Sequence, residues 1–193
     1  MTSVMTNFTV LYDACILYSA SLRNLFMYLA GTGLFRAKWT NEIHEEWIRN
    51  LLLNKPDLTR PALEKIRNLM NDHVLDALVV GYEALAPALS LPDANDAHVL
   101  AAAIQAKADV IVTFNLKDCP DEELKKYGIE AQHPDEFVRH LIDLSLPTTL
   151  EAVKALRESL KNPPYSAEKL LQVWHAQGLP MTVEALRPYS NFI

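Results

Sequence analysis

Two short, mainly hydrophobic runs predict buried strands. One run is Val10–Tyr12 and the other is Val110–Phe114, and neither shows the period-two alternation of a half-buried strand. Compact apolar runs of this length are typical of strands that are covered on both faces, as in parallel sheets. Leu78–Val80 and Ile129–Ala131 are weaker strand candidates.

Between these runs, apolar residues recur every three or four positions, which predicts helices. The stripes are Leu22, Leu25, Phe26 and Leu29, then Ile43, Trp47 and Leu51, and then Val99, Leu100 and Ala103. Strands that alternate with helices favour an α/β fold built around a central parallel sheet.

The last quarter of the chain differs in composition from the rest. Residues 1–147 carry 13 basic and 20 acidic side chains, a balance of -7, whereas residues 148–193 carry 5 and 4, a balance of +1. Thr148 and Glu151 have capping-box spacing, Ser166 is a second N-cap candidate, and Thr182 a third. We therefore predict an α/β unit over residues 1–147 and a helical C-terminal extension over residues 148–193.

Composition excludes several classes of protein. The formal net charge of -6 argues against a protein that coats nucleic acid by neutralising its phosphates. The sequence has no apolar run near the ~20 residues that span a bilayer, and Met1–Asn7 lacks the basic start of a signal peptide. Cys15 and Cys119 have no disulfide-framework or metal-site spacing. These features favour a reduced, cytoplasmic protein without membrane association.

Polar side chains with carboxylate or amide oxygens lie just after each of the two predicted strands. Asp13 comes after the first, and Asn115 and Asp118 come after the second. Ligands bind at the carboxyl edge of open parallel sheets, so these side chains are expected to meet there. Each of them is also an ordinary turn residue, and taken singly that interpretation is the better one.

Asp96 is more informative because it shares a helix face with the apolar positions Val99, Leu100 and Ala103. Asp93 has the sequence position of an N-cap, and Asp96 would then lie in the first helical turn. Capping explains Asp93, but it does not explain why Asp96 should face inward. A carboxylate on a buried face requires a partner.

The helix after Thr40 offers two adjacent acids with different orientations. Glu46 borders the stripe of Ile43, Trp47 and Leu51, whereas Glu45 points away from it into solvent. Clustered carboxylates raise each other's pKa unless a cation joins them, and oxygen ligands suit Mg²⁺ or Mn²⁺.

Four segments of the sequence, in order, resemble the acidic motifs of PIN domains. They are Tyr12–Cys15, Thr40–Trp47, Asp93–Asp96 and Thr113–Asp118. More closely, residues 8–142 resemble VapC-like ribonuclease toxins of bacterial toxin–antitoxin pairs. The resemblance implies a three-layer α/β/α PIN-like fold and an Mg²⁺- or Mn²⁺-dependent endoribonuclease. It also implies in-line attack on an RNA phosphodiester by a metal-activated water.

Carried over position by position, the resemblance implies catalytic and metal-binding roles for Asp13, Glu46, Asp96 and Asp118. It implies supporting roles for Asp93, Thr113 and Asn115. Many relatives have an acid where this chain has Asn115. The implied partners are an RNA substrate, a cognate antitoxin and a second copy in a homodimer.

Two other functions stay open at this point. One is a noncatalytic binding module that keeps the PIN fold and an acidic metal pocket. The other is an aspartyl phosphatase, which fits poorly because Asp13-Ala14-Cys15 has no second acid two residues after Asp13. Arg23, Arg36, Lys38 and Lys117 are better explained as solvated side chains than as phosphate ligands, and both cysteines as packing residues.

Overall fold

The computed structural model describes residues 8–193. Met1–Asn7, and with them the expectation about a signal peptide, lie outside the described residues. The described chain forms a parallel four-stranded sheet in the order β2-β1-β3-β4. Its strands are β1 (Thr9–Tyr12), β2 (Arg36–Lys38), β3 (Val110–Val112) and β4 (Glu130–Gln132). No helix of residues 8–193 is long and apolar enough to cross a membrane.

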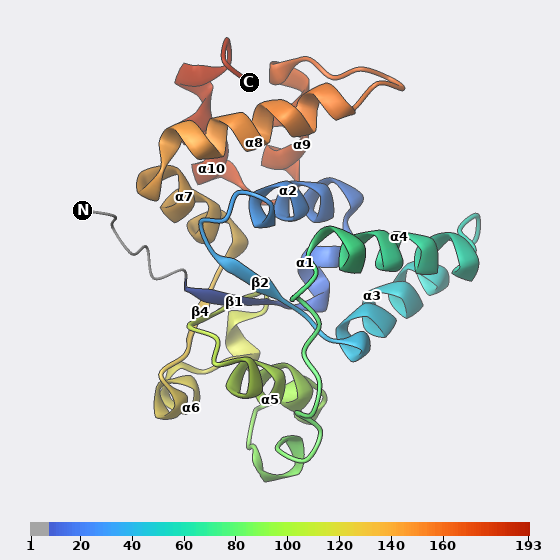
Figure 1. Ribbon diagram of the computed structural model, residues 1–193, viewed down its shortest axis with the longest axis vertical. Coiled ribbons are helices and arrows are strands. Elements are labelled where there is room, and N and C mark those ends of the chain that lie inside the picture. The colour runs from blue at the N-terminus through green and yellow to red at the C-terminus, as the bar shows by residue number, and fades with distance from the viewer. Residues whose placement is uncertain (1–7) are drawn as a thin grey trace.

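Helices cover both faces of this sheet, which confirms the predicted three-layer α/β/α arrangement (Figure 1). The helices are α1 (Ala14–Tyr18), α2 (Ala20–Ala30), α3 (Asn41–Asn54), α4 (Arg60–His73), α5 (Ala97–Ala106), α6 (Asp121–Leu124), α7 (Pro134–Leu144), α8 (Leu146–Ser159), α9 (Ala167–Ala176) and α10 (Pro180–Leu186). Helices α5 and α6 lie on one face, and α1, α2 and α7 lie on the other. Helices α3 and α4 project to one side as a hairpin, and α8, α9 and α10 add a layer over α2 and α7.

The two apolar runs are strands, although the second ends at Val112 rather than Phe114. Ile129–Ala131 contributes to β4, whereas Leu78 forms only an isolated bridge with Trp39. Strand β2 was missed by the sequence analysis. Its three residues are polar, apolar and polar, and a single apolar position carries no periodic signal.

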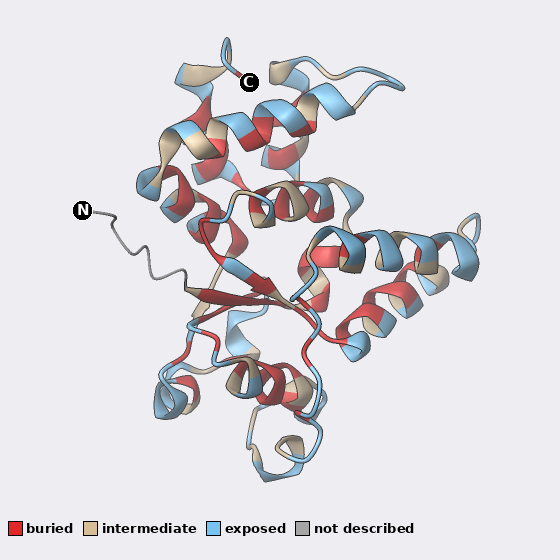
Figure 2. Cartoon of the chain, in the orientation of Figure 1, coloured by how far each residue is buried: buried red, intermediate tan, exposed pale blue. Residues whose placement is uncertain are grey.

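The core lies between the sheet and its helices, where buried residues line the strands and inner helix faces (Figure 2). Trp39, Trp47 and Trp174 are fully buried in it. The helical stripes predicted from the sequence are all part of this core. Burying both faces of β1 and β3 explains why their residues, apart from Thr9, are apolar.

The C-terminal helices begin at other residues than the capping signals predicted. Helix α8 starts at Leu146 with Pro147 in its first turn, so Thr148 is not its N-cap. Ser166 does cap α9, because its hydroxyl accepts a hydrogen bond from Lys169 N. Thr182 is not a cap either, since α10 begins at Pro180.

The N-terminus of α10 is capped from another helix. The buried carboxylate of Asp135 in α7 accepts hydrogen bonds from Met181 N and Thr182 N, both at 2.8 Å. The Thr182 hydroxyl in turn donates to the backbone oxygen of Asp135 at 3.3 Å. A local sequence pattern cannot predict a cap that is supplied by a distant helix. The prediction that Thr182 is an N-cap was therefore wrong.

Candidate active site

Asp13 lies where β1 ends and α1 begins. It is the N-cap of α1, and its Oδ1 accepts a hydrogen bond from Ala14 N at 2.6 Å. Its own backbone N–H donates to Val112 at the end of β3. The carboxyl ends of β1 and β3 are neighbours, as the sequence predicted, so Asp13 is held at the expected sheet edge.

The second carboxylate oxygen of Asp13 is held by two donors. Thr113 Oγ1 donates to Asp13 Oδ2 at 2.7 Å, and Cys15 Sγ donates to the same atom at 3.0 Å. The Thr113 hydroxyl also accepts from Asn115 N at 2.9 Å, and Cys15 Sγ accepts from Phe114 N at 3.3 Å. These bonds join α1 to the loop after β3.

Cys15 therefore does more than the packing role predicted for it. Burial and the negative charge of Asp13 raise the pKa of the Cys15 thiol, so the sulfur keeps its proton and donates to Asp13. The sequence signal was only its position, two residues after Asp13. A thiol with a raised pKa is a poor nucleophile at neutral pH.

Asp96 lies at the junction of a 3₁₀ turn (Ala94–Asp96) and α5, where it makes no side-chain cap. Asp93 caps this turn by accepting from Asn95 N at 2.9 Å. Burial and then the charges of Asp13, Asp93, Asp118 and Glu46, in that order, together raise the pKa of Asp96 to about 6. The predicted acids therefore gather around Asp96 closely enough for their charges to interact.

Asp118 and Asn115 come from the loop after β3, in and just before a 3₁₀ turn (Leu116–Asp118). The Asn115 amide donates to Asp118 Oδ2. This bond holds the half-buried Asp118 carboxylate at the same edge as Thr113. The Asn115 side chain thus acts as a hydrogen-bond donor to Asp118. An ionised acid at this position could not donate such a bond.

Glu46 and Glu45 point in different directions, as the helical spacing predicted. Glu46 is half-buried, and its Oε2 lies 3.5 Å from His98 Nε2. Glu45 forms a bidentate ion pair with Arg60, with both N–O distances under 3 Å, on the solvent side. The inward assignment of Glu46 agrees with the structure.

His98 adds a basic group to the acidic cluster that the sequence analysis did not single out. Burial alone would lower its pKa, but the hydrogen bond with Glu46 and the charges of Glu42, Glu46 and Asp13 outweigh burial and raise it. Its Nδ1 is buried without a hydrogen-bond partner and lies 3.8 Å from Glu42 Oε2. His98 follows Asp96 by two residues, which was the only available signal.

Comparison with known proteins adds three findings to this geometry. A family model described as a PIN domain matches residues 9–117. The chain belongs to the PIN-domain family. A second family model, described as the VapC50 C-terminal domain, matches residues 134–188. The putative ribonuclease VapC50 of Mycobacterium tuberculosis (strain ATCC 25618 / H37Rv) is 37% identical over 115 residues, which cover 60% of this chain and 68% of that protein. No solved structure matches the chain.

The donor set of this PIN domain suits a hard divalent cation. Its predicted ligands offer carboxylate oxygens alone, and burial together with the neighbouring negative charges raises the pKa of Asp96. No group of three His, Cys, Asp or Glu side chains among residues 8–193 is already arranged as a metal site. Asp13 and Asp118 already accept hydrogen bonds from protein donors, and a carboxylate oxygen that accepts one such bond keeps a lone pair for a cation.

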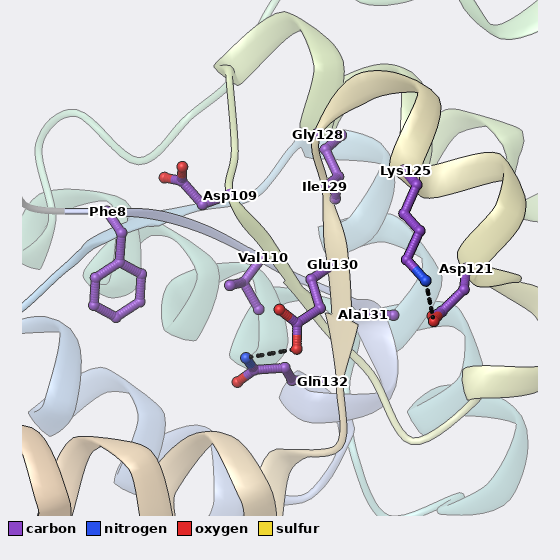
Figure 3. A pocket seen from close by; sticks show the side chains of 10 residues that line it. All are labelled: Phe8, Asp109, Val110, Asp121, Lys125, Gly128, Ile129, Glu130, Ala131 and Gln132. Atoms are coloured by element: carbon purple, nitrogen blue, oxygen red, sulfur yellow. Dashed lines mark hydrogen bonds and ion pairs between the residues drawn. The ribbon is translucent and has the colours of Figure 1, made fainter.

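A pocket of about 790 Å³ lies at the opposite edge of the PIN-domain sheet (Figure 3). Phe8, Asp109 and Ile129, which precede β1, β3 and β4, are among its lining residues. Its charged groups already have partners: Lys125 bonds Asp121 at 3.0 Å, Gln132 donates to Glu130 at 3.2 Å, and Thr9 N donates to Asp109 at 2.7 Å. Because none of the predicted acids lines this pocket, it is separate from the candidate active site.

The four basic residues considered from the sequence behave differently from one another. Arg23 is buried rather than solvated: its Nη1 donates to Leu17 O at 2.6 Å, and its guanidinium carbon lies 5.0 Å from the centre of the Trp47 ring. This cation–π contact and backbone bond make it a core residue of α2. Arg36 and Lys117 are exposed, and the Lys38 ammonium donates to Asp76 O.

Proposed function

We propose that the chain is a metal-dependent endoribonuclease and the toxin component of a toxin–antitoxin pair. The observation that carries this proposal is the convergence of carboxylates from four separate segments around Asp96. Membership of the PIN-domain family and the similarity to a putative ribonuclease support the same reaction class. The reaction is hydrolysis of RNA phosphodiester bonds.

Asp13, Glu46, Asp96 and Asp118 are the proposed ligands of Mg²⁺ or Mn²⁺ and the catalytic acids. A bound divalent cation supplies positive charge to the phosphate and lowers the pKa of water. Asp96 is suited to this role because burial and the neighbouring acids both disfavour its negative charge, and a cation bound to its carboxylate offsets that charge. Four carboxylates without a cation would repel an RNA phosphate instead.

In this proposal, the remaining site residues orient the ligand carboxylates or change the charge around them. Thr113 orients Asp13, and Asn115 orients Asp118, each through a hydrogen bond to a carboxylate oxygen. Asp93 contributes negative charge from the rim, where it is exposed. His98 contacts Glu46, and the neighbouring acids favour the protonated form of its imidazole.

The proposal includes the partners and organisation implied by the resemblance. It gives the protein an RNA substrate, a cognate antitoxin and a homodimeric, cytoplasmic state without membrane association. It divides the chain into a nuclease unit over residues 1–147 and a helical extension over residues 148–193. An antitoxin would inhibit most directly by placing a basic side chain among the carboxylates.

A noncatalytic binding module is the second candidate. The observation that favours it is that both oxygens of Asp13 are already bonded to protein donors. Such a module would bind a divalent cation without cleaving RNA.

The deciding experiment is cleavage of total cellular RNA by the purified protein with Mg²⁺, with Mn²⁺ and with chelator. We expect discrete fragments that require metal and disappear in Asp13→Asn and Asp96→Asn, both checked for folding by circular dichroism. Cleavage that survives in both variants would overturn the proposed site. Metal binding by calorimetry without cleavage of any RNA would establish the binding module instead.

A further inference from the structure

The corner between α9 and α10, residues Gln177–Leu179, contacts two segments of the candidate active site. One is α1, which follows Asp13, and the other is the loop after β3, which carries Asp118. The Ser19 hydroxyl donates to Gln177 Oε1 across 158 positions of sequence. A methyl group built on Gly178 would lie 3.5 Å from Cε1 of Phe114, so the bare backbone there packs against that ring. One point of the C-terminal region therefore reaches α1 and the loop after β3 together.

The first contact acts on the helix that Asp13 begins. Helix α1 has only five residues, with Asp13 at its N-cap and Ser19 at its C-cap. Ser19 is also the N-cap residue of α2, but its hydroxyl makes no capping bond there. The Ser19 hydroxyl is instead committed to Gln177. Because α1 is so short, fixing Ser19 restrains the position of Asp13.

The second contact acts on the loop that carries Thr113 and Asn115. Phe114 lies between them in sequence, and its ring meets His133 edge-on with centroids 5.0 Å apart. Its backbone N–H donates to Cys15 Sγ, the same sulfur that donates to Asp13. Gly178 has φ of +86°, a conformation that L side chains rarely adopt, so glycine suits the turn that meets this ring.

The corner itself is firmly held. Gln177 N, Gly178 N and Leu179 N all donate to carbonyls of the last turn of α9. Leu179 within the corner and Trp174 just before it are both fully buried. The Asp135 carboxylate fixes the start of α10 immediately afterwards. A corner restrained in this way can hold its neighbours in place rather than follow them.

We propose that the Gln177–Leu179 corner is a positioning element of the acidic site. It fixes the position of α1 relative to the Thr113–Asp118 loop, so that Thr113 and Cys15 can donate their hydrogen bonds to Asp13. The C-terminal helices would thereby contribute to RNA cleavage. The kinetic test of this proposal rests on the proposed function. The residues of the corner touch no reacting atom and act through Ser19 and Phe114.

The test compares Gln177→Ala, Ser19→Ala and the double variant in the full chain. We expect kcat for RNA cleavage to fall about tenfold in each, with KM within about twofold, because positioning acts on the transition state. The double variant should be no worse than either single variant, since both remove one contact. Ser19→Thr keeps the hydroxyl and should retain most of the activity. Gln172→Ala is the matched control, because its amide bonds only Glu168 on the exposed face of α9.

Hydrogen exchange without metal supplies a readout that does not depend on catalysis. In Gln177→Ala, peptides covering Asp13–Ser19 and Thr113–Asp118 should exchange at least about threefold faster than in Gln172→Ala. Phe114→Leu, which withdraws the ring from Gly178, should accelerate the same two peptides. Faster exchange confined to α9, with unchanged kcat, would overturn the proposal. If wild type cleaves no RNA, the nuclease function fails, and the exchange result alone decides the role of the corner.

Discussion

Thr113 Oγ1 donates a 2.7 Å hydrogen bond to Asp13 Oδ2, although 100 positions separate the two residues in sequence. Thr113 is buried, and its hydroxyl also accepts from Asn115 N. Thr113→Val keeps the shape but removes both bonds. We expect kcat/KM for RNA cleavage to fall about tenfold or more and the free energy of unfolding to fall by about 1–3 kcal/mol. Thr113→Ser restores the hydroxyl, so equal losses in both variants would contradict the assignment.

Asp96 makes stability depend on pH in a direction opposite to that of an ordinary paired carboxylate. Its pKa is raised from 3.8 to about 6 by burial and then by the neighbouring acids. The folded protein therefore binds more protons than the unfolded chain between these values. Its free energy of unfolding falls as pH rises from about 4 to about 7, by at most ~3 kcal/mol and less where water screens the group.

Urea unfolding of the metal-free protein at pH 4.5, 5.5, 6.5 and 7.5 measures this dependence. We expect Asp96→Asn to lack this contribution, so the variant gains stability relative to wild type as pH rises. Adding Mg²⁺ at pH 7.5 should stabilise wild type and have little effect on Asp96→Asn. An unchanging difference between the two proteins across these pH values would show that Asp96 does not titrate in this range.

Glu46 and Glu45 are adjacent acids that form a matched pair for mutagenesis. Glu46→Gln removes a charge that acts on Asp96 and contacts His98, so cleavage should fall about a hundredfold. Glu45→Gln breaks an exposed pair with Arg60 and should change stability by less than about 1 kcal/mol without affecting cleavage. Both are measured as kcat/KM on one RNA substrate. Comparable losses in the two variants would remove Glu46 from the site.

Asp135 is predicted to matter for stability. Its buried carboxylate accepts two backbone N–H groups of α10, and charge-assisted bonds of this kind are about twice as strong as neutral ones. Asp135→Ala leaves both donors unsatisfied and should reduce the free energy of unfolding by about 2–4 kcal/mol in chemical denaturation. Asp143→Ala is the control, because Asp143 bonds only the neighbouring Arg139 at the surface. A loss below 1 kcal/mol for Asp135→Ala would contradict the capping role.

Hydrophobic periodicity and residue position in the sequence were enough to predict two of the strands and the orientation of two glutamates. Compact apolar runs identified β1 and β3, and the 100° rotation per residue separated Glu46 from Glu45. It missed contacts that depend on three-dimensional assembly. The Cys15 thiol became a donor to Asp13 only because β1 and β3 are adjacent, and Asp135 caps a helix 45 positions later. Strand β2 was missed because Arg36–Lys38 is defined by pairing with β1 rather than by its own composition.

The order of the strands has a consequence for the chain while it is being synthesised. Strand β1 leaves the ribosome early but pairs with β3, whose residues emerge about a hundred positions later. Until then Asp13 has neither Thr113 nor Asp96 beside it, and the acids lie on separate stretches of unfolded polypeptide. A nascent chain that ends before Thr113 lacks the hydroxyl that holds Asp13, so under the proposed function it should not cleave RNA. Under the proposed function, cleavage becomes possible only after β1 and β3 have paired.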